Sequence, residues 1–313
     1  IAKGSTSVVD GAESITGQIN IEHKKPTDQK ILFLNGSFMS DTQTDFNALS
    51  SIELSESLYT IVMTHINSNF YTHDSNHDGF IDEPKDSQVS LSNRWLYYRD
   101  NIKIHWGVKL LADQRKGGQK NYSKNNFLLS NDLPWGTDIK NKEFDAYIKA
   151  GVFTNKEQTS SIALISDFSI FNMDGYFGES KYFGKSNRGY LNLIYRNEFS
   201  TNHDLSVGGS ITIEKQREDY NRKYVVNSSF TNYYSDQFGN NITNSNGGFF
   251  GEYTYKYSTL LTTIIGVRTN WYNHGSFELI PRFSLKLLSI SPTIFLLEDK
   301  TPMFSAIGIV YRT

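Results

Sequence analysis

The sequence predicts an all-β protein whose strands run antiparallel in a meander. Apolar and polar residues alternate with a period of two over long stretches. Aromatic residues make up 14% of the 313 residues, and only 6 Pro occur. Many Tyr and Asn with few Ala and Pro are typical of strands and turns rather than of helices.

The alternation is clearest at residues 102–113 and 205–215. In the first stretch one face carries Ile102, Ile104, Trp106, Val108, Leu110 and Ala112, and the other Lys103, His105, Lys109 and Asp113. Residues 162–170 and 191–199 alternate less regularly. One apolar and one polar face indicate a sheet with a different environment on each side.

The connections between these stretches alternate in length. Short turns are expected at residues 40–44, 55–56, 99–101, 155–159, 200–204 and 257–259. Longer polar stretches lie at residues 69–88, 114–142, 173–187, 217–247 and 271–278. Short turns on one rim and long loops on the other are typical of outer-membrane barrels. About a dozen strands of roughly ten residues are expected, the length that crosses the hydrocarbon when tilted.

Aromatic residues gather where the expected strands meet their connections. The groups are Trp95, Tyr97 and Tyr98; Tyr253, Tyr255 and Tyr257; and Trp271 and Tyr272. Such groups fit the aromatic girdles at the two membrane interfaces. The alternative is that Tyr is simply common in strands.

Composition excludes several classes of function. The net charge of −2, from 31 basic and 33 acidic residues, argues against nucleic acid as a partner. The absence of Cys excludes a disulfide framework, a Cys-ligated zinc site and a Cys nucleophile. No H-E-x-x-H or G-x-S-x-G motif occurs, and we expect no enzyme. No run of 18 apolar residues predicts a membrane-spanning helix.

Residues 1–26 differ from the rest. The segment reads IAKGSTSVVDGAESITGQINIEHKKP, and its Gly4, Gly11 and Gly17 indicate tight turns or close backbone approach. It resembles the end of the plug domain of TonB-dependent outer-membrane receptors, whose pattern is I-x-K-G-x-x-S-V-x-x-G-x-x-x-I-x-G-x-I-N-[IV]. The matching residues are Ile1, Lys3, Gly4, Ser7, Val8, Gly11, Ile15, Gly17, Ile19 and Asn20.

Further stretches resemble the Bacteroidetes branch of that family in family order, up to about residue 287. They are HDGFIDEP, NRWLYY, DQRKGGQ, GEYTYKY and GVRTNWYNHGSFELIPRFSLKL. The resemblance implies that residues 1–27 are the C-terminal end of a plug and residues 28–313 part of a transmembrane β-barrel. In the family that barrel is plugged and 22-stranded. It also marks Lys3, Gly4, Gly11, Gly17 and Asn20 as plug-motif residues.

The function implied by the resemblance is energised uptake of a metal chelate, such as a ferric siderophore, across the bacterial outer membrane. Its partners would be outer-membrane lipids, the chelate, and TonB through a more N-terminal part. The chain has no start Met, signal-peptide pattern or TonB box, so we expect a fragment or the product of a broken gene. We also expect that this piece alone is no working transporter, because open sheet edges are not tolerated in hydrocarbon.

Residues 74–82, DSNHDGFID, resemble the front half of a calcium loop. The candidate ligands are Asp74, Asn76, Asp78, the Phe80 carbonyl and Asp82. An EF-hand needs a bidentate Glu at loop position 12, where this chain has Lys85, so the loop is not an EF-hand. The two readings are a calcium-ordered extracellular loop and a polar turn whose Asp and Asn bind their own backbone.

Two rival interpretations of the chain stay open at this point. A secreted, calcium-ordered β-protein for adhesion or carbohydrate binding would also show alternation. An outer-membrane enzyme or a porin on a smaller closed barrel would show it as well.

Arg268 and Arg282 are expected to face the barrel interior, either as structural residues or in contact with ligand. His73 and His77 flank the acidic loop and are either solvated or part of a metal-chelate site.

Overall fold

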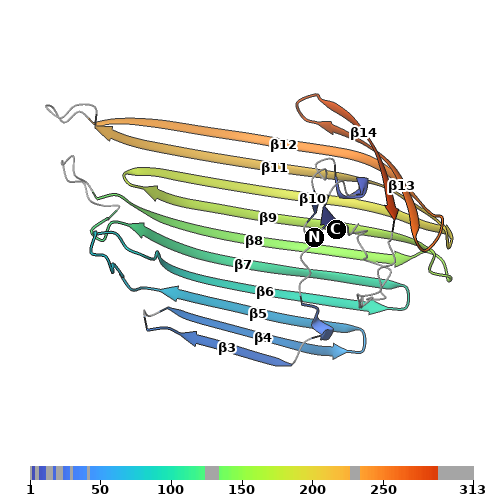
Figure 1. Ribbon diagram of the computed structural model, residues 1–313, viewed down its shortest axis with the longest axis horizontal. Helices are drawn as coiled ribbons and strands as arrows, with labels where there is room; N and C mark the ends of the chain where they lie inside the picture. The colour runs from blue at the N-terminus through green and yellow to red at the C-terminus, as the bar shows by residue number, and fades with distance from the viewer. Residues whose placement is uncertain are drawn as a thin grey trace.

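The computed structural model describes residues 2–3, 7–11, 17–18, 24–28, 31–40, 43–123, 134–225 and 233–287. Within these residues, twelve strands form one sheet, and each strand pairs antiparallel with its neighbours in the chain. Figure 1 shows the strands side by side in chain order from β3 to β14. The predicted all-β antiparallel meander is therefore confirmed.

The strands of the sheet lengthen along most of the chain. They are β3 (Leu32–Phe38), β4 (Thr44–Ser55), β5 (Leu58–Asn69), β6 (Lys85–Arg99), β7 (Ile102–Gly118), β8 (Gly136–Phe153), β9 (Ser160–Phe177), β10 (Ser180–Ser200), β11 (His203–Val225), β12 (Tyr233–Lys256), β13 (Leu261–Tyr272) and β14 (Phe277–Leu287). Ahead of them lie a two-stranded pair, β1 (Ala2–Lys3) and β2 (Gly17–Gln18), and two 3₁₀ turns, η1 (Val8–Asp10) and η2 (Pro26–Asp28). No helix in the described part of the chain is long and apolar enough to cross a membrane.

Five of the six predicted short turns lie at one rim of the sheet. The sixth, predicted at residues 40–44, falls between β3 and β4 at the other rim, and residues 41–42 lie outside the described residues. Residues 56–57, 100–101, 154–159, 201–202 and 257–260 connect strands at one rim of the sheet. At the other rim, the prediction of a long loop is confirmed for residues 70–84, whereas residues 124–133 of the connection 119–135 lie outside the described residues.

The prediction of long loops was wrong at three other places. In residues 173–187, β9 continues to Phe177 and β10 begins at Ser180, while β11 and β12 extend far into the polar stretch 217–247. The third stretch, 271–278, is reduced to the connection 273–276 between β13 and β14. Backbone hydrogen bonds between neighbouring strands do not depend on side-chain polarity, so polar residues extend the ladder where apolar ones end.

The two faces of the sheet differ in the way the sequence predicted. Paired residues share a face, and the pairs Trp95↔Trp106 and Leu91↔Leu110 are apolar on one side. The two indole rings stack with centroids 5.7 Å apart. Apolar side chains on this face stay exposed along many strands: Val89, Leu91, Val108, Leu110, Ile148, Phe168, Leu191, Leu193, Val207, Ile211, Phe249, Ile265, Val267 and Phe283.

A sheet of one layer buries little apolar surface of its own. In the described residues the buried apolar side chains are Val8, Leu49, Ile61, Leu96, Phe153, Phe250 and Ile264. A continuous exposed apolar face of this extent marks a surface that binds a membrane or another protein. Within the described residues, β3 and β14 each have one neighbour only, so the twelve strands do not close on themselves.

Candidate functional site

The polar face carries a segment from the start of the chain. The 3₁₀ turn η1 lies against β12 and β13, and η2 lies against β4, β5 and β6. Ser7 is the N-cap of η1, and its hydroxyl accepts a hydrogen bond from the Val9 amide at 3.1 Å. The segment of residues 7–11 is thus shaped locally and positioned by strands more than 240 residues away.

Three neighbouring strands supply the surface below this segment. The register places Glu252 of β12, Gly266 of β13 and Arg282 of β14 in one row. Gly266 leaves a hollow between the two charged side chains, and Val8 fills it with no exposed surface. A Cβ atom on Gly266 would lie 2.9 Å from both Val8 methyl groups. Glycine is therefore required here for close approach.

Glu252 binds the start of the segment. Its Oε2 accepts hydrogen bonds from the Ser7 hydroxyl at 2.7 Å and from the Val8 amide at 3.1 Å. The residue is 4% exposed. A buried carboxylate is costly unless it is hydrogen-bonded, and these two donors satisfy its Oε2.

Two arginines bind the carbonyl groups of the same segment. Arg282 donates from Nη1 to the Ser7 carbonyl and from Nη2 to the Gly11 carbonyl, both at 2.9 Å. Arg268 donates from Nη1 to the Val8 carbonyl at 3.2 Å. We call Glu252, Arg268 and Arg282 the clamp.

Arg268 is itself held in place by the wall of the sheet. It donates to Asn270 Oδ1 at 2.7 Å and to Ser210 Oγ at 2.6 Å, and its guanidinium lies 5.5 Å from the centroid of the Phe250 ring. Only 4% of the residue is exposed. Because these contacts already fix the guanidinium, its Nη1 group binds the Val8 carbonyl with little further loss of side-chain entropy.

A second contact joins the N-terminal residues to the opposite end of the sheet. Arg94 of β6 donates from Nη1 to the Lys24 carbonyl at 2.9 Å and from Nε to the Tyr147 hydroxyl at 2.7 Å. The Ser51 hydroxyl of β4 donates to the Pro26 carbonyl. The chain thus touches the polar face at β12–β14 and again at β4–β6.

The plug-motif residues are only partly described. Lys3 and Gly17 pair directly in the β1–β2 ladder, and Gly11 lies just after η1 with φ of 115°. Gly4 and Asn20 lie outside the described residues. The assignment of residues 1–27 as the end of a plug stays a prediction, as does that of residues 28–313 as barrel, of which 288–313 lie outside the described part.

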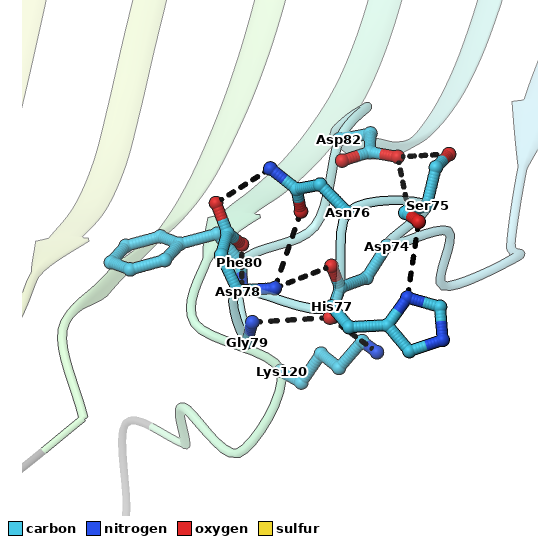
Figure 2. A network of polar contacts seen from close by, with 9 residues as sticks. All are labelled: Asp74, Ser75, Asn76, His77, Asp78, Gly79, Phe80, Asp82 and Lys120. Carbon is cyan, nitrogen blue, oxygen red and sulfur yellow. Dashed lines mark hydrogen bonds and ion pairs between the residues drawn. The ribbon is translucent and has the colours of Figure 1, made fainter.

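The acidic loop of residues 74–82 binds its own backbone (Figure 2). Asp74 accepts hydrogen bonds from the amides of Asp78 and Gly79, both at 3.1 Å. Asp82 Oδ2 accepts from the amide and the hydroxyl of Ser75, at 2.8 and 2.7 Å.

Two further contacts within the loop involve Asp78. Its Oδ1 accepts from the Phe80 amide at 2.8 Å, and its Oδ2 from the Asn76 side-chain amide at 3.0 Å. These are the turn contacts that Asp and Asn form with nearby backbone and with one another.

A lysine from the next connection completes this loop. Lys120 Nζ lies 2.6 Å from Asp74 Oδ2, and the Asp74 side chain is 2% exposed. The hydrogen bond from Lys120 holds the pKa of Asp74 below its usual value, and the amide of Ser75 does the same for the pKa of Asp82. Among the described residues, no three Asp, Glu or His side chains converge to hold a metal. Calcium binding by Asp74, Asn76, Asp78, Phe80 and Asp82 stays a prediction.

Sequence reasoning found part of the clamp. Arg268 and Arg282 were expected to face the barrel interior, and both lie on the polar face of the sheet. Glu252 was missed, although the alternation along β12 puts it on that face. The partners Ser7 and Val8 could not be identified from the sequence, because nothing local connects them to a strand near residue 252.

Comparisons with known proteins support the fold. No protein-family model matches the chain, and neither does any curated protein. Among solved structures, the complex of FpvAI with a pyocin matches with a TM-score of 0.64 and 15% identity over 90% of this chain and 42% of that chain.

Two further solved structures match the same share of this chain or a smaller one. The siderophore receptor PiuA from Acinetobacter baumannii gives a TM-score of 0.62 and 13% identity over 90% of this chain and 49% of that one. The outer membrane transporter YddB from Escherichia coli gives a TM-score of 0.59 and 10% identity over 77% of this chain and 35% of that one. The chain thus spans less than half the length of these structures. The sheet has the fold of part of an outer-membrane receptor barrel, which confirms the predicted fold class.

Proposed function

We propose that this chain forms part of a TonB-dependent outer-membrane receptor that takes up a metal chelate such as a ferric siderophore. One observation carries the proposal: a continuous sheet, apolar on one face and polar on the other, holds an N-terminal segment on its polar face. The apolar side chains would face lipid, and the polar face would line a hydrated passage. The location that follows is the bacterial outer membrane.

The N-terminal residues give this passage its gate. Residues 7–11 are bound to the polar face at β12–β14 and residues 24–28 at β4–β6, on the face that a substrate would pass. Uptake then requires the segment to move or rearrange, and TonB would supply the energy through a more N-terminal part of the protein. Binding and gating break no covalent bond, so the protein would be a transporter and no enzyme.

The substrate class is proposed from the solved structures of similar fold. PiuA is described as a siderophore receptor, and the chain covers 49% of its length. The polar face of the described sheet offers charged and amide side chains such as Lys109, Glu143 and Asp145. Such groups suit a hydrated polar ligand better than a lipid-like one.

The alternatives fit the structure less well. A secreted adhesion or carbohydrate-binding protein would expose its long apolar face to water, which soluble proteins avoid. A small closed porin or barrel enzyme would have no need of an N-terminal segment on its polar face, where residues 7–11 are bound.

The test is iron uptake by cells that carry or lack the gene. Radioactive iron would be offered as ferric citrate, a ferric hydroxamate and a ferric catecholate. We expect one chelate to be taken up only by cells with the gene, and uptake to stop when a protonophore removes the gradient that energises TonB. Equal uptake by both cell types for every chelate, or uptake that resists the protonophore, would contradict the proposal.

A further inference from the structure

We propose that Glu252, Arg268 and Arg282 are positioning residues that fix residues 7–11 to the wall as a permanent anchor. The rearrangement that opens the passage then occurs elsewhere along the N-terminal residues. This inference deepens the proposed function and rests on it only for the transport cycle. The anchoring itself can be tested in membranes without any substrate.

The first argument is that the clamp recognises backbone. Its three side chains bind the carbonyls of Ser7, Val8 and Gly11 and the amide of Val8, and only the Ser7 hydroxyl is bound as a side chain. Glu252 and Arg268 are buried with the segment in place, and release would break all of these hydrogen bonds together. A contact of this kind is suited to holding and unsuited to repeated opening.

The second argument is burial. Val8 has no exposed surface, and Glu252 and Arg268 are each 4% exposed. Separating a buried charge from its partner is far more costly than separating an exposed one. At the other contact, the Arg94 hydrogen bond to the Lys24 carbonyl is exposed to solvent. The Ser51 hydrogen bond to the Pro26 carbonyl in the same contact is buried. The attachment of residues 24–28 thus combines a buried and an exposed hydrogen bond, and this is the end expected to move.

The geometry offers a direct test with an engineered disulfide. A Cβ atom on Gly266 would lie 3.5 Å from Val8 Cβ, within the range of disulfide Cβ separations. Its other close neighbours are the two Val8 methyl groups, which the substitution removes. The natural chain has no Cys, so the Val8→Cys/Gly266→Cys variant contains a single pair of thiols.

The transport experiment compares the oxidised and the reduced form of this variant. The variant is made in the protein as the cell produces it. The linked peptides are confirmed by mass spectrometry, and the chelate is the one identified in the uptake assay. We expect the disulfide to form and the oxidised form to transport iron within about twofold of the reduced form, since a fixed anchor loses nothing by being linked. Uptake that falls about tenfold on oxidation and returns on reduction would overturn the proposal. Failure of the disulfide to form would overturn it as well.

Thiol labelling tests the anchor independently of transport. In isolated outer membranes, a maleimide should modify the Val8→Cys variant at least about tenfold more slowly than a Ser40→Cys variant, whose side chain is exposed. Adding Arg268→Ala and Arg282→Ala to Val8→Cys should remove the protection. Equal labelling of residues 8 and 40 with the clamp intact would overturn the proposal. If no chelate is transported but residue 8 is protected by the clamp, the proposed function fails and the anchor stands.

Discussion

The clamp and the acidic loop use the same chemistry in different surroundings. In both, charged side chains bind backbone amides or carbonyls. In the loop, Asp74 and Asp82 bind groups within seven residues of themselves. In the clamp, Glu252 binds Ser7 and Val8 across about 245 residues, in a buried row between strands.

This difference decides what each contact contributes. Apart from those of Asp74, whose side chain is 2% exposed and also contacts Lys120, the loop contacts lie next to water, so solvent replaces a lost contact at small cost. The clamp contacts join two distant parts of the chain, and a lost partner leaves a charge buried without compensation. The clamp is therefore expected to tolerate substitution far less than the loop.

The largest effect is expected from Arg268→Ala. It removes a buried guanidinium and leaves the Val8 carbonyl, Asn270 Oδ1 and Ser210 Oγ without this donor, at a cost of about 1–3 kcal/mol for each buried acceptor left unsatisfied. In the Val8→Cys background, maleimide labelling of residue 8 should become much faster. The matched control is Arg94→Ala, which removes an exposed contact and should leave labelling of residue 8 unchanged. Slow labelling in the Arg268→Ala variant would show that the segment does not depend on the clamp.

The next effect is expected from Gly266→Ala. The new Cβ meets both Val8 methyl groups at 2.9 Å, which forces the segment away from the wall at a cost of roughly 1–3 kcal/mol. Susceptibility of residues 7–11 to added protease should rise. In the double variant Val8→Ala/Gly266→Ala the clash disappears, because the two Cβ atoms are 3.5 Å apart, and part of the protection should return. A double variant as labile as the single one would contradict this packing.

A smaller effect is expected from Arg282→Lys. Lysine keeps the charge but has no planar fork, so it cannot bind the Ser7 and Gly11 carbonyls with two fixed N–H groups. We expect a loss of about 1 kcal/mol, comparable to one hydrogen bond, and protease susceptibility between the natural protein and Arg282→Ala. If Arg282→Lys and the natural protein are equally resistant, the bidentate geometry is unimportant.

Acid is expected to destabilise the loop of residues 74–82, whereas a change of pH near neutrality is expected to leave it unaffected. The pKa values of Asp74 and Asp82 are lowered in the folded protein, so their contribution is present above the usual Asp pKa and is lost as pH falls through the lowered values. Proteolysis of residues 74–82 by an acid-stable protease should therefore be constant from about pH 8 to 5 and increase below about pH 4. An increase that begins near pH 6 would contradict the assignment to these two carboxylates.

The smallest effect concerns calcium. Lys120 occupies Asp74 Oδ2, so any ion would have to displace an ammonium group. We expect Lys120→Met to increase the protection of the loop that added calcium gives against protease, compared with the natural chain. Magnesium, which needs stricter octahedral geometry, serves as the control ion. If calcium protects neither form, the loop is a polar turn only.

The sequence alone determined the class of structure. A period of two along Ile102–Gly118 and His203–Val225 can be satisfied only by strands with unlike faces, and the short turns lie where short polar stretches interrupt that pattern. The same local rules located the loop of residues 74–82, because its contacts join residues close in sequence. Strand ends were poorly predicted at residues 173–187, since polar residues extend a ladder without any change in the pattern.

Only the tertiary structure decided where the start of the chain binds. The row of Glu252, Gly266 and Arg282 exists because the register aligns three strands, and Val8 fits it because the middle residue has no side chain. Alternation shows that Glu252 lies on the polar face but gives no partner for its charge. That partner lies far away in sequence, and contacts over such separations leave no periodic pattern in the chain.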